Sequence, residues 1–138
     1  MRKASKIIYL VAGIVSIVAA VAYLVWGIVL VVLPNTDGFH EIAQEIIKQN
    51  PDIPDFTEDI VKGIFIACGV CCLIACACAG VNSFLGFKAH KEDHPTRALQ
   101  VLNIVFGVLS GVEVNIAGSI FSFIADGQES RRAIENKE

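Results

Sequence analysis

Charge is missing from three long stretches of this 138-residue chain. Residues 7–33 carry no acidic or basic side chain, residues 60–87 carry only Lys62, and residues 98–125 carry only Glu113. A soluble domain would carry more surface charge over such lengths, so the pattern argues against one. A helix of about 20 apolar residues crosses a ~30 Å hydrocarbon layer. The sequence therefore predicts an integral membrane protein whose partner is the lipid bilayer.

Alternation of apolar and polar residues is also missing from these stretches. Strands of membrane barrels alternate in this way, whereas helices satisfy their own backbone groups within lipid. The predicted fold class is therefore all-α: a transmembrane helical bundle formed by a single integral membrane domain over residues 1–138. Two long spans are expected at about residues 7–33 and 60–87.

The first stretch also resembles a cleavable signal, because Arg2, Lys3 and Lys6 precede it and Ala20-Val21-Ala22 looks like a cleavage site. The apolar core of a signal is usually about 7–15 residues long. Here the apolar run continues to Leu33. We therefore expect an anchor that is retained.

The third stretch allows two interpretations. As one helix it crosses once, giving three single spans and placing Glu113 and Asn115 within the membrane. As a helical hairpin with legs at about residues 98–111 and 114–125, it returns the tail (residues 126–138) to its starting side and takes Glu113 to a wet surface. We favour the hairpin, because an intramembrane carboxylate costs about 2.5–3.5 kcal/mol. Its legs are short, so they would tilt little, thin the bilayer or re-enter.

Positive charge is scarce between the first two spans. Residues 34–59 contain seven acidic side chains and one basic one, Lys48, whereas residues 1–6 contain three basic side chains and no acidic one. Basic loops tend to stay in the cytoplasm. We expect a multi-pass protein of the cell membrane with a cytoplasmic N-terminus, a cytoplasmic loop at 88–97 and an acidic outer loop at 34–59. Tyr9, Tyr23 and Trp26 are expected as anchors at the membrane interfaces.

The outer loop contains one amphipathic segment. Apolar side chains recur at helical spacing there, at Phe39, Ile42, Ala43, Ile46 and Ile47. This pattern predicts an extracellular helix of about three turns, on the membrane surface or on the end of the bundle.

Cysteine is absent outside the second span, where five occur between residues 68 and 78. A Cys-x-x-Cys pair could indicate metal or redox chemistry, but a thiol in hydrocarbon keeps its proton and is then a poor ligand. The five share a helix face with alanines, and small residues let membrane helices approach closely. We expect helix packing through small residues in all spans and no metal site. The expected packing residues are Gly13, Ser16, Ala20, Cys68, Cys72, Ala75, Cys76, Ala79, Gly107, Gly111 and Gly118.

Motifs for catalysis are missing. The chain has no nucleophile with a matched base, no phosphate-binding glycine loop, no zinc ligand set and no basic aromatic surface for nucleic acid. His90 and His94 make at most half of a metal site, and Pro95 follows them. We expect no enzyme, no cofactor and no nucleic-acid partner.

A basic start, Met1-Arg2-Lys3, leads into a long helix dotted with glycine and alanine, and the segments Leu102–Gly111 and Gly118–Asp126 are rich in small residues. This layout resembles uncharacterised small multi-pass membrane proteins of Gram-positive bacteria. The resemblance implies two short helices around a polar turn in the last block, and it implies no activity. Tetraspanin-type and claudin-type proteins share the general topology, but their outer-loop cysteines are missing here.

Two functional hypotheses follow. The first is a non-enzymatic membrane protein that acts through helix contacts, with itself as a homo-oligomer or with another membrane partner. The alternative is a small transporter or channel subunit that uses the polar residues Asn103, Glu113 and Asn115 within the membrane.

Overall fold

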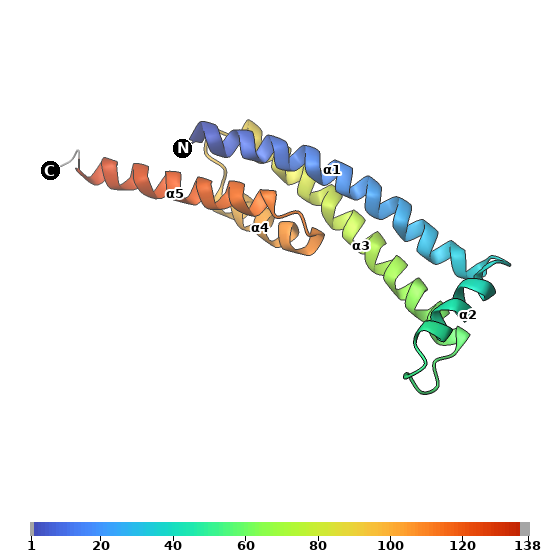
Figure 1. Cartoon of the computed structure of the whole chain (residues 1–138). Helices are drawn as coiled ribbons and strands as arrows, with labels where there is room; N and C mark the ends of the chain where they lie inside the picture. The colour runs from blue at the N-terminus through green and yellow to red at the C-terminus, as the bar shows by residue number, and fades with distance from the viewer. Residues whose placement is uncertain (1, 136–138) are drawn as a thin grey trace. The chain divides into compact units, whose positions relative to one another are not determined.

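The computed structural model describes residues 2–135, with the side chains of residues 3–114 and 116–131. Every regular element in that part of the chain is helical, which confirms the all-α prediction (Figure 1). The elements are α1 (Arg2–Val32), the short 3-10 helix η1 (Leu33–Asn35), α2 (Phe39–Gln49), α3 (Glu58–Lys91), α4 (Arg97–Ser110) and α5 (Val114–Glu135).

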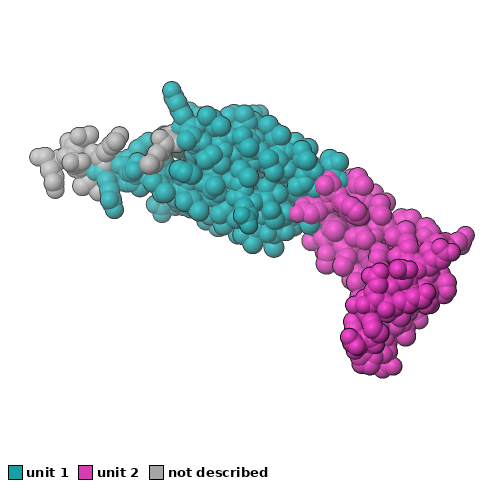
Figure 2. All heavy atoms as spheres, viewed as in Figure 1, with its two compact units in different colours: residues 1–21, 75–138 teal, residues 22–74 magenta. Residues whose placement is uncertain are grey.

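The contacts divide the chain into two compact units (Figure 2). Unit 1 consists of residues 1–21 and 75–138, and unit 2 consists of residues 22–74. Helices α1 and α3 each contribute one part to each unit.

Helices α1 and α3 are each long and apolar enough to cross a membrane, by length and composition. Both extend past the apolar runs predicted from the sequence. The first turn of α3 adds Glu58 and Asp59, and its last turn adds Lys88 and Lys91. The acidic side chains lie at the partly positive N-terminal end of the helix, and the basic ones lie at its partly negative C-terminal end. Both therefore stabilise the extra turns.

The third apolar stretch is two helices joined by a turn, which confirms the predicted break in the helix. Gly111 ends α4 with a φ of 67°, a left-handed conformation that glycine adopts without strain. The N–H of Val112 donates to the carbonyl of Gly107 at 3.0 Å, as in a Schellman motif. The carbonyl of Glu113 accepts from Ile116 at 3.0 Å and starts α5.

Helix α5 runs well beyond the predicted leg. Residues 126–135, which were expected to form part of a tail, continue the helix to Glu135. The sequence contains no proline after Pro95, so nothing removes a backbone donor from this segment.

Unit 2 confirms the amphipathic helix of the acidic loop. Phe39 and Ala43 of α2 are buried together with Val61 of α3. The ring of Phe39 meets that of Phe65 edge to face, with centroids 5.5 Å apart. His40 lies 2.7 Å from a carboxylate oxygen of Glu58. Of the two places expected for this helix, the structure shows it packed on the end of α3.

In unit 2 the backbones of α1 and α3 also approach closely. A Cβ atom at Gly69 would lie 3.0 Å from the carbonyl oxygen of Gly27 and 2.7 Å from a methyl group of Val31. Only glycine fits this contact without displacing its neighbours.

Unit 1 has an apolar core of Tyr9, Leu85, Ala89 and Leu99, against which Phe106 packs. Tyr9 is only 1% exposed. The prediction of Tyr9 as an interface anchor is therefore wrong, because a side chain buried between helices cannot contact the headgroup layer.

Candidate functional site

Buried polar side chains gather in unit 1 and join its four helical segments. We call this set the polar seam. Its members are Ser5, Tyr9, Ser16, Asn82, Ser83, Gln100, Asn103, Ser110, Ser119 and Ser122.

Asn82 stands at the centre of the seam and is fully buried. Its side-chain Nδ2 donates to the hydroxyl of Ser16 on α1 at 3.3 Å and to that of Ser110 on α4 at 3.4 Å. A buried amide without partners would cost about 1–3 kcal/mol. These bonds therefore fix the levels at which α1, α3 and α4 meet.

Gln100 plays the same part between α4 and α5. Its Nε2 lies 2.8 Å from the hydroxyl of Ser122, 3.0 Å from a carboxylate oxygen of Asp126 and 3.2 Å from the carbonyl of Pro95. Three acceptors surround this nitrogen, so the amide orientation is fixed: the reverse orientation would place oxygen against oxygen. The contacts place Ser122 and Asp126 of α5 beside the start of α4.

Two amide oxygens of α4 are left over. Oε1 of Gln100 and Oδ1 of Asn103 are buried and accept no hydrogen bond from any residue that the structure describes. The Nδ2 of Asn103 donates to the carbonyl of Leu99, one turn back, at 3.0 Å. Buried acceptors of this kind are usually satisfied by water or by a bound group.

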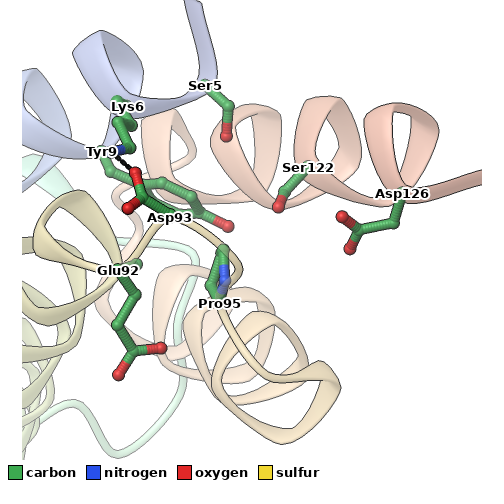
Figure 3. A pocket seen from close by; sticks show the side chains of 9 residues that line it. Ser5, Lys6, Tyr9, Glu92, Asp93, Pro95, Ser122 and Asp126 are labelled. Atoms are coloured by element: carbon green, nitrogen blue, oxygen red, sulfur yellow. Dashed lines mark hydrogen bonds and ion pairs between the residues drawn. The ribbon is translucent and has the colours of Figure 1, made fainter. Parts of the chain in front are cut away.

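The start of α1 is tied to α5 and to the loop after α3. The hydroxyl of Tyr9 lies 3.2 Å from that of Ser119, and the hydroxyl of Ser5 donates to the carbonyl of Gly118 at 3.2 Å. The ammonium group of Lys6 pairs with Asp93 (Figure 3). The ring of His90 donates through Nδ1 to the carbonyl of Lys6 at 2.9 Å.

A small cavity lies among these contacts. Its volume is about 10 Å³, which is close to the space that one water molecule needs. Three segments surround it, as Figure 3 shows: α1 with Ser5, Lys6 and Tyr9, α5 with Ser122 and Asp126, and the segment around Glu92–Pro95. The cavity suits one water molecule and is too small for a metabolite.

The predicted packing residues fall into three groups. Gly13, Ser16, Ala79, Gly107 and Gly118 are buried, whereas Ala20, Cys72, Ala75 and Cys76 are half-buried, and Cys68 and Gly111 are exposed. A Cβ at Gly118 would lie 3.1 Å from the ring of Tyr9, and one at Gly13 would lie 3.2 Å from the ring of Phe87. Among the predicted packing residues, close contact is thus clearest at these two glycines.

Of the three polar residues expected within the membrane, the structure describes the side chains of Asn103 and Glu113. Asn103 is buried in α4, whereas Glu113 is exposed in the turn. The side chain of Asn115 lies outside the described part of the structure. Asn103 and Glu113 therefore meet different surroundings.

Sequence reasoning missed most of the seam, above all Asn82, Gln100 and Ser119. The available signal was their spacing: Ser119, Ser122 and Asp126 recur at three and four residues and share one face of α5. The spacing shows that this face of α5 is polar, but it does not show which helix covers the face.

The cysteines and histidines form no metal centre in the described residues, where no group of three or more His, Cys, Asp or Glu side chains is placed to hold an ion. Cys68 and Cys71 are exposed and the other three cysteines are half-buried.

Comparison with known proteins gives no match: no family model, no curated protein and no solved structure is similar to this chain.

Proposed function

We propose that this chain is a non-enzymatic multi-pass membrane protein whose α4–α5 hairpin enters the bilayer without crossing it and is covered there by a protein partner. The partner is a second copy of the chain or another membrane protein. Three features support this function: the exposure of α1 and α3, the level of the hairpin, and the exposure of Glu113.

Exposed apolar surface supports insertion of α1 and α3. In the most apolar part of each helix, only 11% of the residues are buried. Val18 is 65% exposed on α1, and Ile74 is 60% exposed on α3. The core helix of a soluble protein would be mostly buried, and apolar surface this extensive is unfavourable in water.

The arrangement of unit 1 supports a cytoplasmic side for both ends of the chain. Gln100, at the start of α4, bonds Ser122 and Asp126, so α5 returns to the level where α4 began. The hydroxyl of Ser5 on α1 donates to the carbonyl of Gly118 on α5. The start of α1, the loop before α4 and the end of α5 therefore share one side, and basic residues in these segments favour the cytoplasm.

The hairpin is too short to cross. Helix α4 has 14 residues, or roughly 21 Å at ~1.5 Å per residue, against a ~30 Å hydrocarbon layer. Asn82 joins Ser110, at the end of α4, to Ser16 of α1. Ser16 is nine residues beyond Ile7, roughly 14 Å by helix rise, and the uncharged run of α1 has its midpoint at Ala20. The end of α4 thus lies within the hydrocarbon layer, short of its middle.

The exposure of Glu113 is the observation that carries the proposal. Both Glu113 and Gly111 are exposed at the turn. At this depth, lipid offers no partner for a carboxylate or for turn backbone, and such segments occur only where protein or a water-filled cavity covers them. A partner that covers the turn would remove this cost, so contact through the hairpin is the expected mode of action.

Site-specific photo-crosslinking in native membranes tests the proposal. Benzoylphenylalanine in place of Glu113 should give a discrete protein adduct, because a partner covers the turn. The same probe in place of Ile74, an exposed residue of α3, should give lipid adducts. Recovery of only the uncrosslinked monomer with the probe at 113 would contradict the proposal.

A second candidate, a small transporter or channel subunit, is favoured by the two unsatisfied amide oxygens of Gln100 and Asn103. Buried polar groups with vacant acceptors suit a path for water or a cation through the bundle. Ion flux into liposomes carrying the purified protein, abolished by Glu113→Gln or Asn103→Leu, would support transport. Absence of flux from folded protein would count against it.

A further inference from the structure

A groove on α3, within unit 1, combines aromatic and basic side chains. Phe84, Phe87, Lys88 and Lys91 line an open hollow of about 450 Å³. Their offsets of three, four and seven residues from Phe84 place all four on one face of the helix. None of the contacts described for the polar seam uses these side chains.

The aromatic half of the groove is partly fixed and partly free. The ring of Phe87 packs beside Gly13 of α1, where a Cβ atom added at Gly13 would lie 3.2 Å from the ring. Phe84 is 68% exposed, the highest value among the large apolar side chains described. Phe87 therefore forms a fixed floor, and Phe84 offers its surface to a group from outside the chain.

The basic half of the groove has uncommitted charge. Lys88 and Lys91 are both exposed, and neither forms an ion pair with any side chain that the structure describes. They lie three residues apart on the helix, close enough for one anion to contact both. Lys6, a basic residue of α1 in the same unit, is already paired with Asp93.

The position of the groove along α3 matches the boundary of a bilayer, and this step rests on the function proposed above. Residues 63–87 carry no charge, and Lys88 is the first basic residue after them. Phe84 and Phe87 then lie at the inner edge of the hydrocarbon layer, and the two lysines lie among the headgroups. Lysines at this level attract the headgroups of anionic lipids.

We propose that this groove binds one anionic phospholipid. Lys88 and Lys91 hold its phosphate, and the upper part of an acyl chain lies along Phe84. A zwitterionic phosphatidylcholine fits less well, because its choline cation would approach the same two ammonium groups. The charge of the groove thus selects the headgroup, and the aromatic rings select a ligand that carries an apolar chain.

Native mass spectrometry of the full chain in detergent tests this inference, with dioleoylphosphatidylglycerol and dioleoylphosphatidylcholine as probes at equal concentrations. The expected result is one tightly bound phosphatidylglycerol, favoured over phosphatidylcholine by about tenfold. Lys88→Gln with Lys91→Gln should remove that preference. Phe84→Ala should weaken phosphatidylglycerol binding several-fold, whereas Val108→Ala, at an exposed site on α4, should leave it unchanged.

A charge-matched control separates this groove from general attraction between basic protein and anionic lipid. Lys3→Gln with Arg97→Gln removes the same charge from exposed positions outside the groove, and the lipid preference should persist. Equal loss in both double variants, or no loss in the Lys88/Lys91 variant, would overturn the inference. Displacement of the lipid by excess soluble glycerol phosphate would also overturn it, since the site would then recognise the phosphate ester alone.

Failure of this inference is distinguishable from failure of the proposed function. Retention of the wild-type chain in membranes after an alkaline carbonate wash, without a preference for phosphatidylglycerol, would remove only the lipid site. Release of the chain by the wash would contradict membrane insertion and the lipid site together.

Discussion

Gly27 and Gly69 face each other where α1 meets α3 in unit 2, so closely that neither position has room for a side chain. A Cβ at Gly27 would lie 2.8 Å from a methyl group of Leu73 and 3.2 Å from the carbonyl oxygen of Gly69. The backbones themselves are in contact, as expected for membrane helices that associate through small residues.

Gly69→Ala should therefore destabilise the protein, because the new methyl group overlaps Val31 and the carbonyl of Gly27. Overpacking of this kind typically costs about 1–3 kcal/mol. The matched control is Gly63→Ala on the same helix, where a Cβ would meet nothing within 4 Å. There the gain in helix propensity should leave stability equal or raised by up to about 1 kcal/mol. Unfolding in mixed micelles, followed by circular dichroism, measures both, and equal stability of the two variants would refute the close contact.

Asn82 and Ser16 should be energetically coupled, because their hydrogen bond joins α3 to α1 inside unit 1. In a double-mutant cycle with Asn82→Ala and Ser16→Ala, we expect a coupling energy of about 0.5–1.5 kcal/mol. Ser5→Ala is the control, since Ser5 bonds Gly118 instead, and its effect should add to that of Asn82→Ala. Strict additivity of Asn82→Ala and Ser16→Ala would show that the bond contributes nothing.

Gln100→Ala should loosen the hairpin, because Ser122, Asp126 and the carbonyl of Pro95 all lose the same donor. Loss of a buried donor costs about 1–3 kcal/mol. Gln128→Ala, at an exposed position on α5, should change stability by no more than about 0.5 kcal/mol. Hydrogen exchange of the α5 backbone amides should rise in the first variant only, and unchanged protection there would contradict the role given to Gln100.

The helices themselves could be predicted from the sequence. In lipid, long uncharged runs that lack alternating polar residues satisfy their backbone as helices, and α1 and α3 follow from them. The spacing of Phe39, Ala43 and Ile46 predicted α2, since apolar residues at this period mark one helix face. The break in the last block was predicted from the cost of an intramembrane Glu113, and the structure makes it at Gly111, the left-handed residue that ends α4.

The polar contacts between helices could not be predicted in the same way. Which residues Asn82 or Gln100 meets depends on the rotation and level of each helix against its neighbours, and sequence period fixes neither. Tyr9 illustrates the difficulty: its place near the end of an apolar run suggested a headgroup anchor, yet helix rotation turns it toward Ser119. The extent of α5 was missed for another reason, because loss of hydrophobicity after Ala125 marks the end of an apolar run and not the end of a helix.

Cysteine accessibility across sealed membranes, with the native cysteines replaced, tests the central claim of a hairpin that enters and returns. Reporter positions are provided by Lys3→Cys, Glu45→Cys, Glu113→Cys and Glu129→Cys. We predict that a membrane-impermeant maleimide labels positions 3 and 129 from one side and position 45 from the other, while position 113 reacts from neither. Labelling of positions 45 and 129 from the same side, or rapid labelling of 113 from the side opposite to position 3, would contradict the account.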